Sequence, residues 1–316
     1  MAAGAALAAV VAAGALHAVR GARAPNRTHP WLEAGANRSY VSLPVIVKET
    51  PHEPDAFTQG LCFDLDGTLY ESDGLYRRSQ VRRVDVATGR SLKRKANKGE
   101  HFGEGLTLVG RSLFQLTWRE GIMHEYDVAT LALRNSMPQP FRGEGWGLAY
   151  DERRKVAYAT DGSYHVHVLD PANGWKATRT PLRVADPRLD GGLIEGLNEL
   201  EMVEGELWAN ILPLRHHKAS PCVARIDVDT GRVIGWLDFS ALNKRQSARV
   251  RRQPHNLVLN GIAYRRPAGA ARPTLLATGK QWDSMFDLDL AGSALGEAHV
   301  RAKCDLHIAP VGGRVG

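Results

Sequence analysis

The chain has 316 residues, of which 43% are hydrophobic and 24% charged, so it is long enough to bury a sizeable core. Its formal net charge is +7, but much of the excess lies in the N-terminal arm and in a basic run at 244–252. Basic runs in loops are usually solvated, and no recognition helix or base-stacking motif accompanies this one. We therefore expect no nucleic-acid partner.

The first residues of the chain are typical of a targeting segment. Residues 2–19 are Ala, Val, Gly and Leu with a single His17, and no acidic residue occurs before Glu33. The run lacks a charged n-region, but its length suits a signal-peptide h-region or a marginal signal anchor. We assign this role to residues 1–24, with the membrane as a partner only if the segment stays uncleaved.

Two glycosylation acceptors follow, Asn26-Arg27-Thr28 and Asn37-Arg38-Ser39, and they fit a secretory route. We expect a glycoprotein that is secreted, or that stays in the lumen or membrane of the ER or Golgi. An organelle transit peptide is the alternative, because Arg occurs here without acidic residues. The segment is poor in Ser, which places that interpretation second.

Five short apolar runs open with the same pattern of a polar or aromatic residue, then Gly, then Leu or Ile. They are Gln59-Gly60-Leu61, Glu104-Gly105-Leu106, Trp146-Gly147-Leu148, Glu195-Gly196-Leu197 and Asn260-Gly261-Ile262. Most of them recur at intervals of roughly 40–50 residues, which is the length that one four-stranded propeller blade uses.

Two further short runs follow each opening, and apolar and polar residues alternate in them with a period of two. The second runs are 69–72, 113–118, 156–161, 207–210 and 275–280, and the third are 81–85, 123–127, 166–170, 223–227 and 285–289. Gly89 and Gly231 supply positive φ at turns between runs. The pattern indicates strands and leaves few windows for a long helix. We predict an all-β, five-bladed β-propeller over residues 45–316, preceded by an N-terminal arm at 25–44.

In a propeller of this kind, the residue before each repeated Gly occupies the same place in every blade. These residues should form a ring near one mouth of the central channel: Gln59, Glu104, Trp146, Glu195 and Asn260. Polar groups on inner strands often only close hydrogen bonds between blades. We expect that simpler role for Glu195 and Asn260.

The cysteines and histidines show no metal-binding spacing. Cys62, Cys222 and Cys304 allow one disulfide at most, with the pairing left open, and Cys62 is expected to be a buried small hydrophobe. His216-His217 are neighbours in a segment that we interpret as a surface loop, and His52 is expected to be structural.

Eight motifs resemble those of the plant-type glutaminyl cyclases (glutaminyl-peptide cyclotransferases), in the same order. They cover about residues 45–290 and stand at 51–61, 102–107, 115–118, 144–148, 160–163, 197–201, 208–210 and 278–282. The resemblance implies a five-bladed propeller, in agreement with the repeat. It also implies that an N-terminal glutamine is converted into pyroglutamate with loss of ammonia, without a cofactor or a catalytic metal. The partners would be peptides or proteins that begin with Gln, and a monomer is expected.

The same resemblance implies the roles of the site residues. Glu104 matches the family's essential acid/base, and Lys280 and Asn198 match pocket residues that polarise the amide carbonyl or hold the peptide. Gln59 matches a further pocket residue. The walls of the pocket would be aromatic: Phe57, Phe102, Trp118 and Trp146. If Phe102 and Trp118 line it, they desolvate Glu104 and raise its pKa.

One departure concerns substrate breadth. The family commonly has a pocket tryptophan where this chain has Leu212, and an insertion follows at 213–220. Two other functions stay open. One is a metal-dependent propeller lactonase or hydrolase that recruits Glu104, Asn198 and Asn260 as ligands. The other is a non-catalytic binding scaffold, which would have no need for both Glu104 and Lys280.

Overall fold

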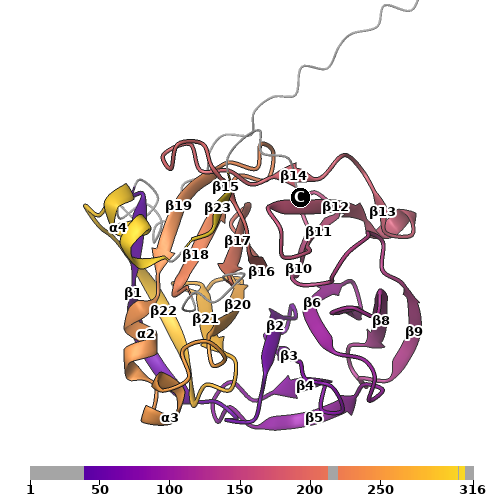
Figure 1. The fold of residues 1–316 in the computed structure, drawn as a ribbon. Helices are drawn as coiled ribbons and strands as arrows, with labels where there is room; N and C mark the ends of the chain where they lie inside the picture. Colours follow the sequence, from indigo (N-terminus) through magenta and orange to yellow (C-terminus); the bar gives the residue numbers. More distant parts are fainter. Residues whose placement is uncertain (1–38, 213–219, 305, 310–316) are drawn as a thin grey trace, which may run out of the picture.

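The computed structural model describes residues 39–212, 220–304 and 306–309, and these are predominantly β-strands. Figure 1 shows the sheets following one another in chain order around a common centre. The predicted targeting segment at 1–24, the two glycosylation acceptors up to Arg38, and His216-His217 lie outside the described residues. Among the residues described, no helix has the length and apolar character needed to cross a membrane.

The first two sheets each contain four antiparallel strands in simple chain order. The strands of the first are β2 (Thr58–Phe63), β3 (Leu69–Asp73), β4 (Gln80–Val84) and β5 (Ser91–Ala96). Those of the second are β6 (Gly103–Val109), β7 (Ser112–Thr117), β8 (Ile122–Asp127) and β9 (Leu133–Pro138). In both sheets the first strand is largely buried and the fourth is largely exposed, so each sheet turns its first strand towards the centre.

The third sheet has five strands, two of which are very short and pair with the same neighbour. They are β10 (Leu148–Asp151), β11 (Val156–Thr160), β12 (His165–Asp170), β13 (Lys176–Ala177) and β14 (Leu182–Arg183), with the 3-10 helix η1 (Pro171–Asn173) after β12. Separately, β15 (Leu193–Ile194) pairs with β23 (Ile308–Ala309) near the end of the chain.

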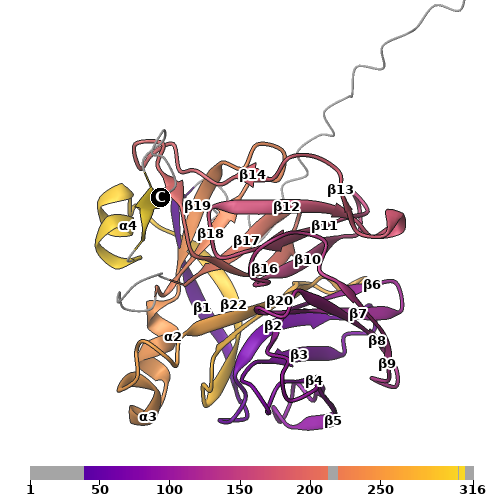
Figure 2. The same ribbon diagram turned by 45° about the vertical axis from the view of Figure 1, so that its right-hand side comes forward.

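The remaining strands form one eight-stranded sheet. Its strands are β16 (Leu197–Val203), β17 (Glu206–Ile211), β18 (Cys222–Ile226), β19 (Val233–Asp238), β1 (Val41–Pro51), β22 (Ser284–Gly292), β21 (Thr274–Gly279) and β20 (Leu259–Arg265). β1 runs antiparallel beside β22 and pairs in parallel with β19 at its first residues. The first described strand thereby joins the last sheet (Figure 1 and Figure 2). It begins inside the segment 25–44 that the sequence assigns to an arm.

Every run predicted from the sequence overlaps a strand, and Gly89 and Gly231 have φ of 70° and 74° in the turns that they were expected to form. The basic run at 244–252, which the sequence predicts as a loop, is largely helical. It contains α2 (Ser240–Arg245) and α3 (Ala248–Arg251), while a third short helix, α4 (Glu297–Lys303), lies near the C-terminus. Arg245 pairs with Glu49 and Arg249 with Asp283, so these cations are anchored to β1 and to the turn before β22.

The repeated glycines have a steric cause, which is the close approach of the innermost strands. A Cβ atom on Gly105 would lie 2.5 Å from the Trp146 carbonyl oxygen, and one on Gly147 would lie 2.0 Å from the Asn198 carbonyl oxygen. Both distances are well below van der Waals contact. Glycine at these positions therefore lets neighbouring inner strands meet at the backbone.

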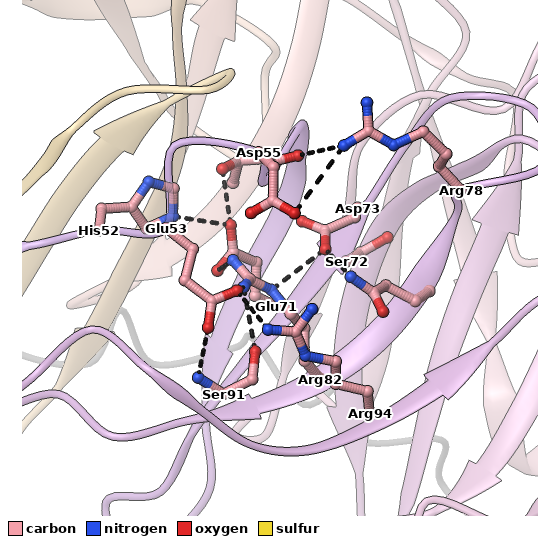
Figure 3. A network of polar contacts seen from close by, with 12 residues as sticks. His52, Glu53, Asp55, Glu71, Ser72, Asp73, Arg78, Arg82, Ser91 and Arg94 are labelled. Carbon is pink, nitrogen blue, oxygen red and sulfur yellow. Dashed lines mark hydrogen bonds and ion pairs between the residues drawn. The ribbon is translucent and has the colours of Figure 1, made fainter.

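A buried ionic cluster stabilises the first sheet (Figure 3). The Arg82 guanidinium, which is fully buried, forms ion pairs with Glu53, with Glu71 at 2.5 Å and with Asp73 at 3.1 Å. On its other side, Glu71 accepts a hydrogen bond from the Thr58 hydroxyl at 2.6 Å, one residue before Gln59. The cluster thus fixes the backbone from which Gln59 projects.

His52 and the cysteines behave as predicted. The His52 ring lies between the Glu71 carboxylate and the Trp282 carbonyl oxygen, at 3.0 Å from each, which is a structural role. Cys62 is buried and unbonded to another cysteine, and burial raises the pKa of its thiol well above the ordinary value. Cys222 forms a disulfide with Cys304, which ties β18 to the end of α4.

Candidate active site

Glu104 is a buried carboxyl group on the innermost strand of the second sheet. It lies in a β-bulge of β6, between the paired residues Gly103 and Leu106, and is 5% exposed. Burial raises the pKa of Glu104 well above its ordinary value, since it disfavours the charged form. The nearby Lys280 opposes this shift, whereas Glu144 and Glu120 reinforce it. The group therefore keeps its proton to a higher pH than an exposed carboxyl group does, and it can exchange that proton.

Gln59 projects from the equivalent bulge of the neighbouring sheet and contacts Glu104 directly. Its side-chain Nε2 donates a hydrogen bond to Glu104 Oε1 at 2.9 Å. Among the described residues, no hydrogen bond is found to the other carboxyl oxygen, Oε2. One oxygen of Glu104 is therefore held by the protein, and the other is left to meet a substrate.

Lys280 directly follows β21 and is 5% exposed. Burial lowers the pKa of Lys280 below its ordinary value, and Glu104 opposes that change, so the two groups lie close enough to influence each other. The ammonium nitrogen lies 5.1 Å from the centre of the Phe57 ring. The backbone is fixed on both sides, because Lys280 N donates to Val258 O and Gln281 N donates to Ala56 O.

Four aromatic rings form a continuous wall beside these groups. Phe102 lies at its centre, with ring centroids 6.2 Å from Phe57, 5.3 Å from Tyr76 and 5.4 Å from Trp118. A Cβ atom on Gly74 would lie 2.4 Å from the Phe102 ring, so this approach requires glycine. The structure thus brings Phe57, Phe102 and Trp118 together as predicted, and it adds Tyr76.

Glu144 is a second residue that the sequence reasoning missed. Its Oε2 accepts hydrogen bonds from the indole Nε1 of Trp118 at 2.8 Å and of Trp146 at 3.0 Å. The Arg119 guanidinium lies 3.7 Å from the centre of the Trp118 ring and donates to Glu144 Oε1. One carboxylate therefore orients both tryptophans. The only signal in the sequence was its place in the motif at 144–148.

Glu120 completes the rim of the site and was also missed. It accepts hydrogen bonds from the Tyr76 hydroxyl at 3.0 Å and from the Phe102 backbone N–H at 3.2 Å. Glu120 thereby fixes two members of the aromatic wall. Neither Tyr76 nor Glu120 shows its role in the sequence, because both lie in connections between strands.

Asn198 occupies the bulge of β16, on the strand next to Trp146 around the centre. It is 2% exposed, and its side-chain Oδ1 is buried without a hydrogen-bond partner among the described residues. A buried amide oxygen without a hydrogen-bond donor destabilises the folded protein unless a ligand or water donates to it. Asn198 and Glu104 occupy equivalent positions, because each lies in the bulge of the first strand of its group.

Glu195 does not belong to that ring, so the prediction for it is wrong. The register shift of β16 falls between Leu197 and Leu200, which places Asn198 and Glu199, not Glu195 and Gly196, at the repeated position. Glu195 instead contacts His307 near the end of the chain. Gly196 is glycine for a different reason: its φ is 77°, and a Cβ atom there would lie 2.2 Å from the Leu212 carbonyl oxygen.

The described residues contain no group of three His, Cys, Asp or Glu side chains placed to hold a metal ion. Leu212, where the resemblance leads one to expect an aromatic residue, is half-buried and hydrogen-bonded through its backbone to Gly196. The described site is thus a buried carboxyl group and a buried ammonium group behind an aromatic wall. Such a pair can exchange a proton and stabilise a developing negative charge.

Comparison with known proteins gives one consistent result. The family model described as glutamine cyclotransferase matches residues 13–290. The chain is 35% identical over 266 residues to the glutaminyl-peptide cyclotransferase of Arabidopsis thaliana, which covers 82% of this chain and 75% of that protein. It also resembles the crystal structure of Myxococcus xanthus glutaminyl cyclase, with a TM-score of 0.67 and 31% identity over 80% of this chain and 98% of that one.

Proposed function

The chain belongs to the glutamine cyclotransferase family, and we propose that it is a glutaminyl-peptide cyclotransferase that converts an N-terminal glutamine into pyroglutamate and ammonia. The observation that carries this proposal is the buried Glu104, whose pKa is raised and which lies near Lys280 behind the aromatic wall. The substrates would be peptides or proteins that begin with Gln.

In the proposed reaction, the α-amine nitrogen of the substrate attacks the carbonyl carbon of its own side-chain amide. A C–N bond forms and closes the five-membered lactam, and the bond to the amide nitrogen breaks. Glu104 accepts a proton from the attacking amine and returns it to the departing nitrogen, which leaves as ammonia. Because the attack is intramolecular, holding the glutamine folded against the aromatic wall supplies a large part of the acceleration, roughly 7–11 kcal/mol in favourable systems.

Lys280 and Asn198 have complementary roles in this proposal. As the tetrahedral intermediate forms, the amide carbonyl oxygen becomes negative, and the Lys280 ammonium is placed to stabilise it. Burial keeps this ammonium away from bulk water, which strengthens its interaction with a charge that develops nearby. Asn198, with its unpaired buried Oδ1, would accept a hydrogen bond from the substrate.

We propose that the sheets form five blades around the centre. The support is that the first two sheets are complete four-stranded units, and that the eight-stranded sheet divides at β1 into β16–β19 and β20–β22 with β1.

We also propose that the protein is a monomer that enters the secretory pathway, where residues 1–24 target it and Asn26 and Asn37 are glycosylated. The disulfide between Cys222 and Cys304 supports this location, because such bonds persist in oxidising compartments.

The direct test is incubation of the purified protein with a Gln-initiated peptide. We expect ammonia release with the matching loss of mass. An N-acetylated copy of the peptide should not react, because acylation removes the lone pair that attacks. Varying the second residue should change kcat/KM only modestly. Cyclisation of an internal glutamine, or equal reaction of the acetylated peptide, would contradict the proposed reaction.

Removal of metal ions should leave the reaction largely unchanged. After dialysis against a chelator, we expect activity near that of the untreated protein at ordinary temperature, because the chemistry is assigned to Glu104 and Lys280. A lower thermal midpoint with retained activity would indicate a cation bound only to the folded state. Loss of activity that zinc alone restores, in protein that stays folded, would favour the metal-dependent hydrolase or another metalloenzyme.

A further inference from the structure

Asn260 connects the last inner strand to the first and reaches the candidate active site. It lies in the bulge of β20, between Leu259 and Ile262, and is 1% exposed. Its side-chain Nδ2 donates to the Thr58 backbone carbonyl oxygen at 3.0 Å, which is the bond between sheets that the sequence predicts. The same Nδ2 also donates to Gln59 Oε1 at 3.1 Å, and that second bond leads to Glu104.

The direction of this chain of hydrogen bonds is set at its backbone end. A carbonyl oxygen only accepts, so the atom of Asn260 that faces Thr58 must be the NH₂ group. The same NH₂ group faces Gln59, so Gln59 must turn its oxygen towards Asn260. Its own NH₂ group is then directed to Glu104 Oε1. Asn260 therefore excludes the flipped orientation, in which the Gln59 oxygen would face the carboxyl group.

We propose that Asn260 is a positioning residue for the cyclisation, which acts through Gln59 to reserve Oε2 of Glu104 for proton exchange with the substrate. This inference rests on the proposed function. Because the Gln59 NH₂ group only donates, Oε1 stays an acceptor whether Glu104 is charged or neutral. This bond favours Oε2 as the site of the proton in the neutral carboxyl group, and no hydrogen bond to Oε2 is found among the described residues.

The hydrogen bond that Asn260 supports also favours the carboxylate form of Glu104, because a donor stabilises a charged acceptor more than a neutral one. The other groups that act on Glu104 are Lys280, Glu144 and Glu120. The side-chain hydrogen bonds of Asn260 go to Thr58 and Gln59 instead. Any effect of Asn260 on proton transfer is therefore transmitted through Gln59.

A double-mutant cycle with Gln-initiated peptide tests this inference. Asn260→Ala should lower kcat about tenfold, the size expected for losing one oriented hydrogen bond, with KM changed less than about threefold. Gln59→Ala should lower kcat further, and the double variant should match Gln59→Ala alone. Asn260→Ser is a second variant, which keeps a polar side chain at this buried position but is too short to donate to Gln59 Oε1. It should lose kcat as Asn260→Ala does.

The pH dependence gives a readout that a purely structural role would not move. The reacting complex shares one proton between Glu104 and the substrate amine, so kcat/KM follows a bell-shaped curve. Asn260→Ala should move the limb that reports the titration of Glu104 to higher pH by about one unit. The reason is that the carboxylate form of Glu104 loses a stabilising hydrogen bond. Asn210→Ala is the matched control: Asn210 accepts from Gly261 N, next to Asn260, and its effect should be small and independent of Gln59.

Each outcome decides between the two levels of the proposal. If the wild-type protein cyclises the peptide, but Asn260→Ala lowers kcat by the same factor in the wild type and in the Gln59→Ala variant, the positioning role is overturned. The proposed function then stands. Retention of wild-type kcat and pH profile in Asn260→Ser would overturn it as well. A folded wild-type protein that does not cyclise the peptide overturns both.

Discussion

Replacing Glu104 with Gln is expected to lower turnover of a Gln-initiated peptide by about 10²–10⁴-fold, the usual share of general acid–base catalysis. The amide keeps the size of the side chain but cannot carry a proton from the attacking amine to the departing nitrogen. The fold should persist, because the variant removes a buried ionisable group whose charged form is costly in its site. The measurement is the rate of ammonia release, with peptide and protein checked beforehand for pyroglutamate already formed.

The matched control for this variant is Glu199→Gln. Glu199 is also buried on an innermost strand, and burial raises its pKa to about 8, but its oxygens accept backbone hydrogen bonds from Leu61 at 3.4 Å and Ile262 at 3.0 Å. Its replacement should lower the free energy of unfolding by about 1–3 kcal/mol through one lost acceptor, and should leave kcat within a few-fold. Near wild-type turnover in Glu104→Gln would remove Glu104 from the mechanism.

Replacing Arg82 with Met is expected to lower the free energy of unfolding by about 3–5 kcal/mol, because it leaves buried carboxylates without their cation. Burial would raise the pKa of Glu71, but Arg82 and His52 outweigh this effect and hold it at about 2. Asp73 shows the opposite shift, to about 7, because burial and the Glu71 charge oppose its ionisation more than Arg82 favours it. Methionine keeps most of the volume and none of the charge. Denaturant unfolding of both proteins measures the difference.

Arg94→Met is the matched control for this second variant, because Arg94 binds the same Glu53 carboxylate from an exposed position. An exposed ion pair contributes about 1 kcal/mol or less, so this variant should unfold nearly as the wild type does.

The free energy of unfolding should also depend on pH, in a direction that the Glu71 pKa sets. The Glu71 contribution is present above its unfolded pKa of about 4.5 and is lost as pH falls towards about 2. This loss should be smaller in Arg82→Met, and equal destabilisation by the two variants would show that burial of the pair is unimportant.

The strands and much of the site could be predicted from the sequence because both follow local rules. Alternation gives the strands, and the repeated glycines mark places where backbones touch, as at Gly105 and Gly147. Gln59 and Glu104 precede such glycines and do meet in the structure. The roles proposed for them come from the family resemblance, whereas their mutual contact follows from the closeness of the two inner strands.

Other parts of the site depend on contacts that no local pattern encodes. Tyr76, Glu120 and Glu144 lie in connections, and they meet the aromatic wall only because neighbouring sheets place those connections together. The fourth ring position was misassigned because it holds Glu199 instead of glycine. The Glu199 side chain reaches across to the backbone of Leu61 and Ile262, so the position is filled by an acceptor that joins three inner strands, β16, β2 and β20. A search for glycine could not find it.

The pairing of β1 with β22 sets an order of events during biosynthesis. The Thr50 hydroxyl donates to the Met285 carbonyl oxygen across 235 residues of chain, and Ser293 reaches back to Val41 across 252. The ribosome releases β1 first, and its partner strand β22 emerges only after about 235 further residues have been made. The pairing of β1 with β22 is therefore a late, long-range step, and proteins dominated by such contacts fold slowly. Until then the edge of β1 facing β22 is unpaired and open to pairing with another extended segment.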